Sequence, residues 1–354
     1  MTTKPTLAAW EYPAVIWGLT RVVFAIITAG VTAPFRGQNG TAEFKRHVLY
    51  AGMRAAVEKL SIRHFHALLP TTSENYTNYA KRKGFKPEMA DIGDGTLGCW
   101  IGHQDADTIL VWFHGGGFAL MGTEEHMDFL HNLVIRTGNK VAVFILQYDV
   151  APQAKYPRQL WQANASIRYL TEDLGKSYSQ LIICGDSAGG SLSAAILGHL
   201  SHPHPKVPPL ANNGMRFKGA LLVSPWVGLD IAAPSFKANS RKDCLSVPGL
   251  RSWTTAFMGD AHMDNYNSPL GAPAEWWKDI QADSVLILAG SDEVLLDDIL
   301  AFAEKLTEHN ETKVQLLVTQ GEAHNPPVSE RQLKINGGPG EMEKKLYEWV
   351  SGQA

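Results

Sequence analysis

From residue 96 onward, the chain alternates between short apolar runs rich in β-branched residues and longer stretches with helical periodicity. Most of these runs lack the period-two alternation that a solvent-exposed sheet face produces, which favours strands buried on both faces. Strands alternating with helices indicate an α/β protein with a mostly parallel open sheet. The predicted strands are 97–101, 108–113, 141–147, 180–184, 220–224, 284–289 and 313–318, and the predicted helices are 124–137, 157–174, 191–200, 295–309 and 341–350.

Two segments do not follow this alternation. Residues 1–84 carry helical patterns at 45–69 and 74–83 after an apolar N-terminal stretch. Residues 226–280 are rich in Trp, Pro and Ser and are too long for an ordinary connection, so we expect them to form a lid. The predicted organisation is a helical segment, 1–84, that contributes to a cap, and a core, 85–354, with a cap insertion at about 226–280.

The composition excludes several classes of protein. The chain has 354 residues, of which 32 are basic and 35 acidic, giving a net charge of −3, whereas a nucleic-acid-binding domain is normally strongly basic. Its three cysteines, Cys99, Cys184 and Cys244, show no CxxC spacing, so we expect reduced thiols rather than a disulfide framework or a metal site. We therefore expect a cytoplasmic protein with no nucleic-acid partner.

The apolar stretch between Pro13 and Pro34 is interrupted only by Arg21. The uncharged run that follows, Val22 to Phe35, has 14 residues. A helix that crosses a bilayer needs about 20 residues. Glu11 and Arg21 disturb the charge order of a secretory signal. We expect a helix packed on the protein; a helix that contacts or anchors to a membrane through residues 13–35, and a signal peptide, are the alternatives.

The pentapeptide Gly185-Asp186-Ser187-Ala188-Gly189 lies between an apolar predicted strand and a predicted helix. A sharp strand-to-helix turn exposes a serine hydroxyl to a base, and such a turn has room only for glycine on either side. The same turn directs the first free amides of the helix at the point where negative charge develops. This context predicts that Ser187 is a nucleophile.

A second motif, His114-Gly115-Gly116-Gly117-Phe118, directly follows the predicted strand 108–113. Three consecutive glycines allow backbone N–H groups to approach a ligand closely, and such amides stabilise an oxyanion. A phosphate-binding loop would need Gly-Lys-Ser/Thr, and a dinucleotide fingerprint would need a further glycine at the right spacing. Neither is present, so the motif favours an oxyanion hole.

A base and an acid are expected after the last two predicted strands. His324 follows the strand at 313–318, where a loop can place an imidazole above the sheet on the side of the nucleophile. An acid that orients this imidazole should follow the strand at 284–289. Asp292 and Glu293 are adjacent there, and position alone does not separate them.

The motifs HGGGF and GDSAGG, followed by an acid and then a histidine, resemble the α/β-hydrolase fold, and more narrowly the hormone-sensitive-lipase-like family of esterases. The resemblance covers roughly residues 85–354. The family's acid lies in Asp-Pro-Leu-x-Asp, which corresponds here to residues 293–297 and places Glu293 at the acid position. A glutamate there is similar to the fungal branch, which also carries an extended N-terminal segment.

This resemblance implies an α/β-hydrolase core, a mostly parallel central sheet flanked by helices, under a helical cap. It implies the catalytic residues Ser187, Glu293 and His324 and an oxyanion hole formed by the N–H groups of Gly116, Gly117 and Ala188. Phe118 and the cap aromatics Trp226, Trp253 and Trp277 would line the substrate pocket; alternatively, the cap aromatics only attach the cap to the core.

We therefore expect a serine esterase that cleaves small-to-medium lipophilic carboxylic esters through an acyl-enzyme, with a role in secondary metabolism, and that needs no metal or cofactor. An amidase, a transacylase or a cyclase acting on a biosynthetic intermediate would use the same nucleophile, so these alternatives stay open. A small-molecule receptor on this fold is a further alternative. A receptor would usually have lost the histidine, but His324 is present.

Overall fold

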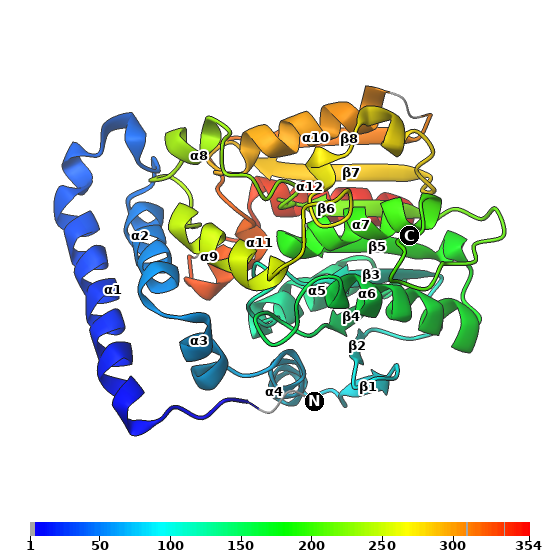
Figure 1. Ribbon diagram of the computed structural model, residues 1–354, viewed down its shortest axis with the longest axis horizontal. Coiled ribbons are helices and arrows are strands. Elements are labelled where there is room, and N and C mark those ends of the chain that lie inside the picture. The colour runs from blue at the N-terminus through cyan, green and yellow to red at the C-terminus, as the bar shows by residue number, and fades with distance from the viewer. Residues whose placement is uncertain (1–3, 309–310, 336) are drawn as a thin grey trace.

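The computed structural model describes residues 4–308, 311–335 and 337–354 and builds them around an eight-stranded sheet (Figure 1). Its strands are β1 (Glu88–Asp91), β2 (Leu97–Ile101), β3 (Thr108–Phe113), β4 (Val141–Gln147), β5 (Leu181–Asp186), β6 (Gly219–Val223), β7 (Ser284–Gly290) and β8 (Lys313–Thr319). Their spatial order is β1-β2-β4-β3-β5-β6-β7-β8. The β1–β2 and β2–β4 pairs are antiparallel and the other pairs are parallel, which confirms the predicted mostly parallel sheet.

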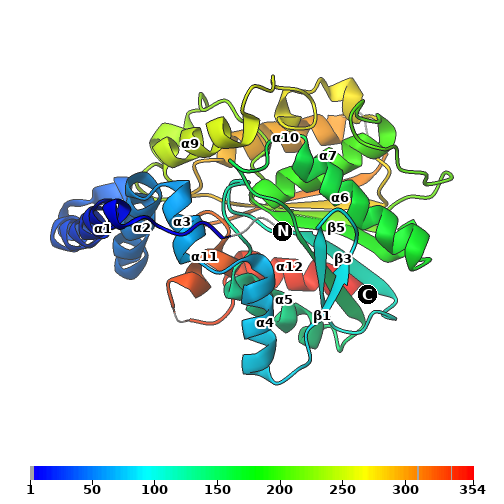
Figure 2. The same cartoon turned by 60° about the horizontal axis from the view of Figure 1, so that its bottom comes forward.

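Helices cover both faces of this sheet (Figure 2). One face packs against apolar side chains of α6 (Arg158–Arg168), α7 (Ala188–Ser201) and α10 (Leu296–Glu308). The other face packs against α5 (Glu124–Arg136) and α12 (Glu341–Gln353), with α4 (Thr72–Lys83) beside them. Burial on both faces explains why the inner strands β3 to β7 are predominantly apolar.

Most predicted elements match the structure, and the differences have local causes. The predicted helix at 157–174 ends as an α-helix at Arg168 and continues as a π-helical turn, Tyr169–Asp173. The pattern at 45–69 is two helices, α2 (Phe44–Lys59) and α3 (Ile62–Leu68), because Ser61 caps the second one. Edge strand β1 and short helix α11 (Pro326–Gln332) were not predicted, and position 309 of the predicted helix 295–309 lies outside the described residues.

The N-terminal helices and the helical part of the 226–280 insertion lie together beyond the carboxyl ends of the parallel strands (Figure 1). The last part of the insertion returns to the amino ends of the strands, where Trp276 stacks on His202. The insertion contains α8 (Ser235–Ala238) and α9 (Val247–Met258), and α9 packs against α2. The outermost element is α1 (Tyr12–Thr32), which lies along α2. Its first turn is attached to α3 because Arg63 donates to the Glu11 carboxylate over 2.7 Å.

The expected packing of the N-terminal apolar helix on the protein holds for one side of α1 only. Val15, Gly18 and Ala29 are its buried residues, and most of its large side chains are exposed. Within the described residues, ten of the 18 exposed large apolar side chains lie between positions 10 and 35. They are Trp10, Tyr12, Ile16, Trp17, Leu19, Val23, Phe24, Ile27, Val31 and Phe35.

Candidate active site

Ser187 occupies the turn between β5 and α7 with φ 55° and ψ −119°, a conformation that L-residues rarely adopt. Glycine is required on both sides of this turn. A Cβ atom at Gly189 would lie 1.8 Å from the Phe113 carbonyl oxygen, and one at Gly185 would lie 2.3 Å from the backbone of Gly189. The turn therefore holds the Ser187 backbone in a strained conformation, as a nucleophile at a strand end requires.

The glycine loop after β3 lies beside this turn. Gly116 and Gly117 adopt φ values of 110° and 62°, which the absence of a Cβ permits. Their N–H groups have no acceptor among the residues that the structure describes. A Cβ at Gly115 would lie 3.1 Å from Cβ of Ser187, so the loop and the nucleophile turn are in close contact. The predicted oxyanion donors thus include two amides available to a ligand.

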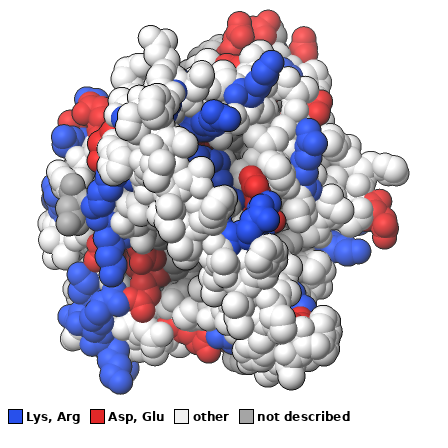
Figure 3. All heavy atoms as spheres, turned by 90° about the vertical axis from the view of Figure 1, so that its left-hand side faces the viewer, with Lys and Arg blue, Asp and Glu red and all other residues white. Residues whose placement is uncertain are grey.

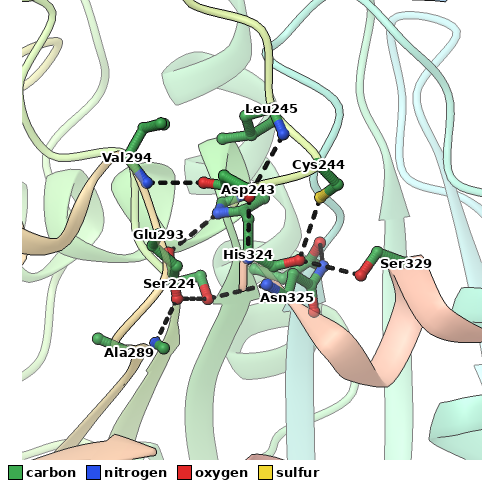
Figure 4. Close-up of polar contacts among 12 residues, drawn as sticks. Ser224, Asp243, Cys244, Leu245, Ala289, Glu293, Val294, His324, Asn325 and Ser329 are labelled. Carbon is green, nitrogen blue, oxygen red and sulfur yellow. Dashed lines mark hydrogen bonds and ion pairs between the residues drawn. The ribbon is translucent and has the colours of Figure 1, made fainter. Parts of the chain in front are cut away.

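His324 and Glu293 meet although they follow different strands, β8 and β7. The imidazole Nδ1 lies 3.1 Å from Oε2 of Glu293, and both side chains are buried (Figure 4). The other carboxylate oxygen, Oε1, accepts from the Ser224 hydroxyl and from the Gly290 N–H, each over 2.6 Å. A carboxylate held at both oxygens orients the ring and stabilises its protonated form.

This contact determines the direction in which the pKa of His324 shifts. Burial alone would lower the pKa of the imidazole, but the hydrogen bond and the negative charge of Glu293 outweigh burial, and the net pKa is raised above 6.5. Asp243 and Asp186 add smaller contributions of the same sign. The site therefore favours a cation at His324, as a base that takes a proton from a hydroxyl requires.

Asp292, the other acid that position alone allowed, faces away from the imidazole. Its carboxylate lies 3.8 Å from the Lys242 ammonium, and its backbone N–H donates to the Glu322 carbonyl. The structure therefore brings Glu293, and not Asp292, to His324.

Ser187 and His324 share the wall of one apolar cavity of about 260 Å³. Gly115 and Gly116 contribute to the same wall. Its apolar side chains come from α2, from α3 and the residue after it, and from α9: Met53, Ala56, Val57, Phe65, Leu69 and Trp253. A Cβ at Gly117 would lie 2.1 Å from the Trp253 ring, so this indole lies directly on the glycine loop.

Of the four predicted pocket aromatics, only Trp253 lies in the wall of this cavity. Phe118 is buried behind the glycine loop, where it stacks on Phe257 with ring centroids 4.0 Å apart. Trp226 lies near Phe118, and Trp277 packs edge-on against Phe302 of α10 with ring centroids 5.2 Å apart. For these three residues, the structure agrees with the alternative, in which they join elements of the fold.

Several polar residues that sequence patterns did not single out support the site. The Asp186 carboxylate accepts from Trp112 and Asn325 and lies 3.2 Å from His126. The bond from Asn325 links the turn that carries Ser187 to the His324 loop. Ser224, after β6, accepts from the Asn325 N–H and donates to Glu293. The position of Asp186 within GDSAG was a signal for its role, but no motif marks Ser224.

Within the described part of the chain, no group of three or more His, Cys, Asp or Glu is arranged to hold a metal ion. The three cysteines are buried free thiols. The chemistry that this arrangement supports is therefore that of a buried acid, a base, a hydroxyl and backbone amides around an apolar cavity.

Comparison with known proteins places these observations among related chains. A family model described as alpha/beta hydrolase fold matches residues 110–327, more than half of the chain. Steryl acetyl hydrolase 1 of Saccharomyces cerevisiae is 27% identical over 242 residues, which cover 63% of this chain and 54% of that protein. An esterase of Acinetobacter venetianus is 28% identical over 236 residues, covering 65% of this chain and 72% of that one. The match thus spans only about half the length of the yeast relative.

Solved structures show the same fold at low identity. Carboxyl esterase 2 of Tuber melanosporum superposes with a TM-score of 0.62 at 21% identity, covering 75% of this chain and 85% of that chain. A thermostable esterase of Pseudomonas putida superposes with a TM-score of 0.67 at 19% identity, covering 88% and 97%.

The Glu293–His324 contact can be tested without an activity assay. In the wild-type protein, NMR titration of the imidazole should give a His324 pKa above 6.5, because the buried carboxylate stabilises the cation. Glu293→Gln keeps the burial but removes the charge, so the pKa should fall below 6.5.

Asp292→Asn is the matched control, because it removes a neighbouring carboxylate that does not contact the ring, and the His324 pKa should stay above 6.5. An unchanged titration in the Glu293→Gln protein, or a shift of equal size in the control, would contradict the pairing.

Proposed function

Because this chain belongs to the alpha/beta hydrolase fold family, we propose that it is a serine hydrolase that cleaves carboxylic esters through an acyl-enzyme intermediate. One observation carries the proposal: His324, paired with the buried Glu293, lines an apolar cavity together with Ser187 and with Gly116, whose N–H group has no acceptor among the described residues. The names of the related chains, steryl acetyl hydrolase and esterase, support the same reaction class.

In the proposed mechanism, the Ser187 hydroxyl attacks the ester carbonyl carbon while Nε2 of His324 takes its proton. Glu293 stabilises the imidazolium at Nδ1. The oxyanion accepts hydrogen bonds from the N–H groups of Gly116, Gly117 and Ala188. Each donor stabilises the transition state by about 3 kcal/mol. His324 then protonates the leaving alkoxide, and a water deprotonated by the same ring releases the acid and regenerates Ser187.

The cavity favours a small acyl group on an apolar alcohol. Its volume of about 260 Å³ is modest, and Trp253 lies directly on the glycine loop where the acyl group would sit. The apolar side chains from α2 and α3 suit a lipophilic alcohol portion better than a charged one. An acetate or similar short ester of a lipophilic alcohol fits both features, as the name of the yeast relative also suggests.

The first test is hydrolysis of a p-nitrophenyl ester series from acetate to decanoate. The wild-type protein should prefer the short esters, and Ser187→Ala should lower kcat by about 10⁴-fold or more, because it removes the nucleophile. Full activity in Ser187→Ala would contradict the mechanism. A folded wild-type protein that binds these esters without hydrolysing them would instead indicate a receptor. Hydrolysis of the matching anilides would indicate an amidase. Transfer of the acyl group to an added alcohol would indicate a transacylase.

The acyl-size limit can be tested at Trp253. Trp253→Ala removes the indole that lies against Gly117, so octanoate should gain in kcat/KM relative to acetate by about tenfold, from a pocket contact worth about 1.4 kcal/mol. Trp277→Phe changes a buried tryptophan outside the cavity wall and should leave the preference unchanged. The same chain-length profile in wild type and Trp253→Ala would show that another group limits the acyl side.

We further propose that the protein works on the cytoplasmic side of a membrane, bound in the plane of the surface through α1. The helical stretch Ala9–Phe35 is long and apolar enough to cross a bilayer, and only 17% of its most apolar window is buried. Figure 3 looks onto this side of the molecule, where uncharged areas lie between lysine and arginine side chains, with acidic side chains among them. Apolar side chains with lysine and arginine beside them suit a membrane interface that contains anionic headgroups.

The packing of α1 favours an orientation in the membrane plane over a spanning one. Because α2 lies alongside α1, a spanning α1 would bring Lys45, Arg54 and Lys59 of α2 toward the hydrocarbon. Each such charge costs about 2.5–3.5 kcal/mol at the bilayer centre. In the plane of the interface, the outward stripe of Trp10, Trp17, Phe24 and Val31 enters lipid while α2 stays in water. The cytoplasmic side is favoured by the free thiols.

Vesicle co-sedimentation tests this surface. The wild-type protein should sediment with phosphatidylcholine vesicles, and more strongly when they contain phosphatidylserine. The double substitution Trp17→Ser/Phe24→Ser removes two large exposed rings and should weaken binding by at least about tenfold, since each buried ring contributes about 1.5–3 kcal/mol.

The matched control, Ile135→Ser/Met263→Ser, removes exposed apolar side chains elsewhere on the surface and should bind as the wild type does. Hydrolysis of p-nitrophenyl acetate should be unchanged in both variants. Failure of the wild-type protein to bind either vesicle, or equal binding by the Trp17→Ser/Phe24→Ser protein, would exclude this docking surface.

A further inference from the structure

The loop between α8 and α9 places one buried carboxylate against both loops that carry the Glu293–His324 pair. Asp243 has no exposed surface. Its Oδ2 accepts from the N–H of Val294 over 2.7 Å, and its Oδ1 accepts from the N–H of His324 over 3.1 Å and of Leu245 over 3.3 Å (Figure 4). Two of these three amides belong to His324 itself and to the residue after Glu293.

These bonds act on the main chain of the two loops, in addition to the Asp292 N–H bond to the Glu322 carbonyl and the Asn239 side-chain bond to the Glu293 carbonyl. Ser224 and Gly290 hold the Glu293 side chain, and Ser329 and Cys244 donate to the His324 carbonyl. Asp243 instead accepts from the main chain of both loops at once. A change in either backbone would alter the 3.1 Å contact between the carboxylate and the imidazole.

The Asp243 loop is itself held from outside by the N-terminal segment. Arg54 of α2 donates to the Asp243 carbonyl oxygen, and Glu58, one turn later, accepts from the Ser246 hydroxyl over 2.8 Å. The same helix supplies Met53 and Val57 to the cavity wall. Through these contacts, α2 holds the loop in place against the two strand-end loops.

We propose that Asp243 is a positioning residue for the reaction: its carboxylate holds the Glu293 and His324 loops in register, and its charge helps to stabilise the imidazolium. The proposal rests on the proposed hydrolytic function for its kinetic readout, although its structural readout does not.

The charged groups around the imidazole agree on the direction of the electrostatic effect. His324 is faced by the carboxylates of Glu293, Asp243 and Asp186, all of which raise the pKa of the ring. On the far side of Asp243, the Arg54 guanidinium contacts the Asp243 backbone. Removing the Asp243 charge should therefore lower the pKa of His324 and move the acid limb of the pH–activity profile to lower pH.

Asp243→Asn tests both parts of the role. An asparagine has one carbonyl oxygen and one NH₂ group, so its NH₂ must face either the Val294 N–H or the His324 N–H, and one loop loses its acceptor. With p-nitrophenyl acetate, kcat should fall by about 10- to 100-fold, because a small displacement of an orienting group reduces the rate by this much. KM should change little, and the His324 pKa, measured by NMR, should fall.

Asp292→Asn is the matched control, because it removes a nearby carboxylate that holds neither loop amide, and its kcat and His324 pKa should stay at wild-type values. The concentration of folded Asp243→Asn protein is measured by active-site titration with a phosphonate ester. The loss of kcat should remain when the rate is calculated per titrated site. Wild-type kcat and an unshifted His324 pKa in that protein would overturn the proposal.

Arg54→Gln covers the case in which Asp243→Asn does not fold. This substitution keeps the carboxylate but loosens its loop, so kcat should fall by several-fold with KM unchanged. An unfolded Asp243→Asn together with wild-type kcat in Arg54→Gln would show that Asp243 serves the fold alone and would overturn the proposal. If the wild-type protein hydrolyses no ester, the proposed function fails, and the NMR titration still decides the role of Asp243.

Discussion

The buried hydrogen bond between Glu293 and His324 depends on the parallel arrangement of the sheet, because strands that run in the same direction end at the same edge. β7 and β8 are paired from Ser284↔Lys313 to Gly290↔Thr319, so the loops that follow them start side by side. The turn with Ser187 and the glycine loop leave β5 and β3 at this edge too. A rigid sheet thus sets the positions of these side chains and amides, which must lie within fractions of an ångström of the productive geometry.

What the sheet does not fix, buried polar contacts do. Asp186 joins the nucleophile turn to the His324 loop through Asn325, and Ser224 joins that loop to Glu293. Each of these groups is buried, so an unsatisfied partner would be costly, and the network has few alternative arrangements. The N-terminal helices add a further restraint. One side of α2 lines the cavity and the other packs against α1, so the surface proposed to meet the membrane lies one helix away from the cavity.

The sequence predicts the core of this architecture because the inner strands are nearly continuous apolar runs between turns, whereas edge strand β1, Glu88–Asp91, is mostly polar and was missed. The ranges 97–101, 108–113 and 141–147 coincide with β2, β3 and β4. Ser187, His324 and Glu293 can be singled out because motif and strand order limit the candidates. Ser224 and Asp243 cannot, because their bonds join residues 69 and 81 positions apart, to Glu293 and His324, with no local pattern. The pocket aromatics were over-predicted for the same reason: composition does not show whether a tryptophan faces a cavity or the core.

The central claim is that one hydroxyl, at position 187, is activated by the buried pair. Reaction with diethyl p-nitrophenyl phosphate, followed by intact mass and peptide mapping, measures this directly, since only a serine activated by a base attacks the phosphorus at an appreciable rate. The account predicts a single diethylphosphoryl adduct on the peptide that contains Ser187, formed more slowly as His324 becomes protonated. An adduct on another residue, or a folded protein that stays unmodified, would contradict it.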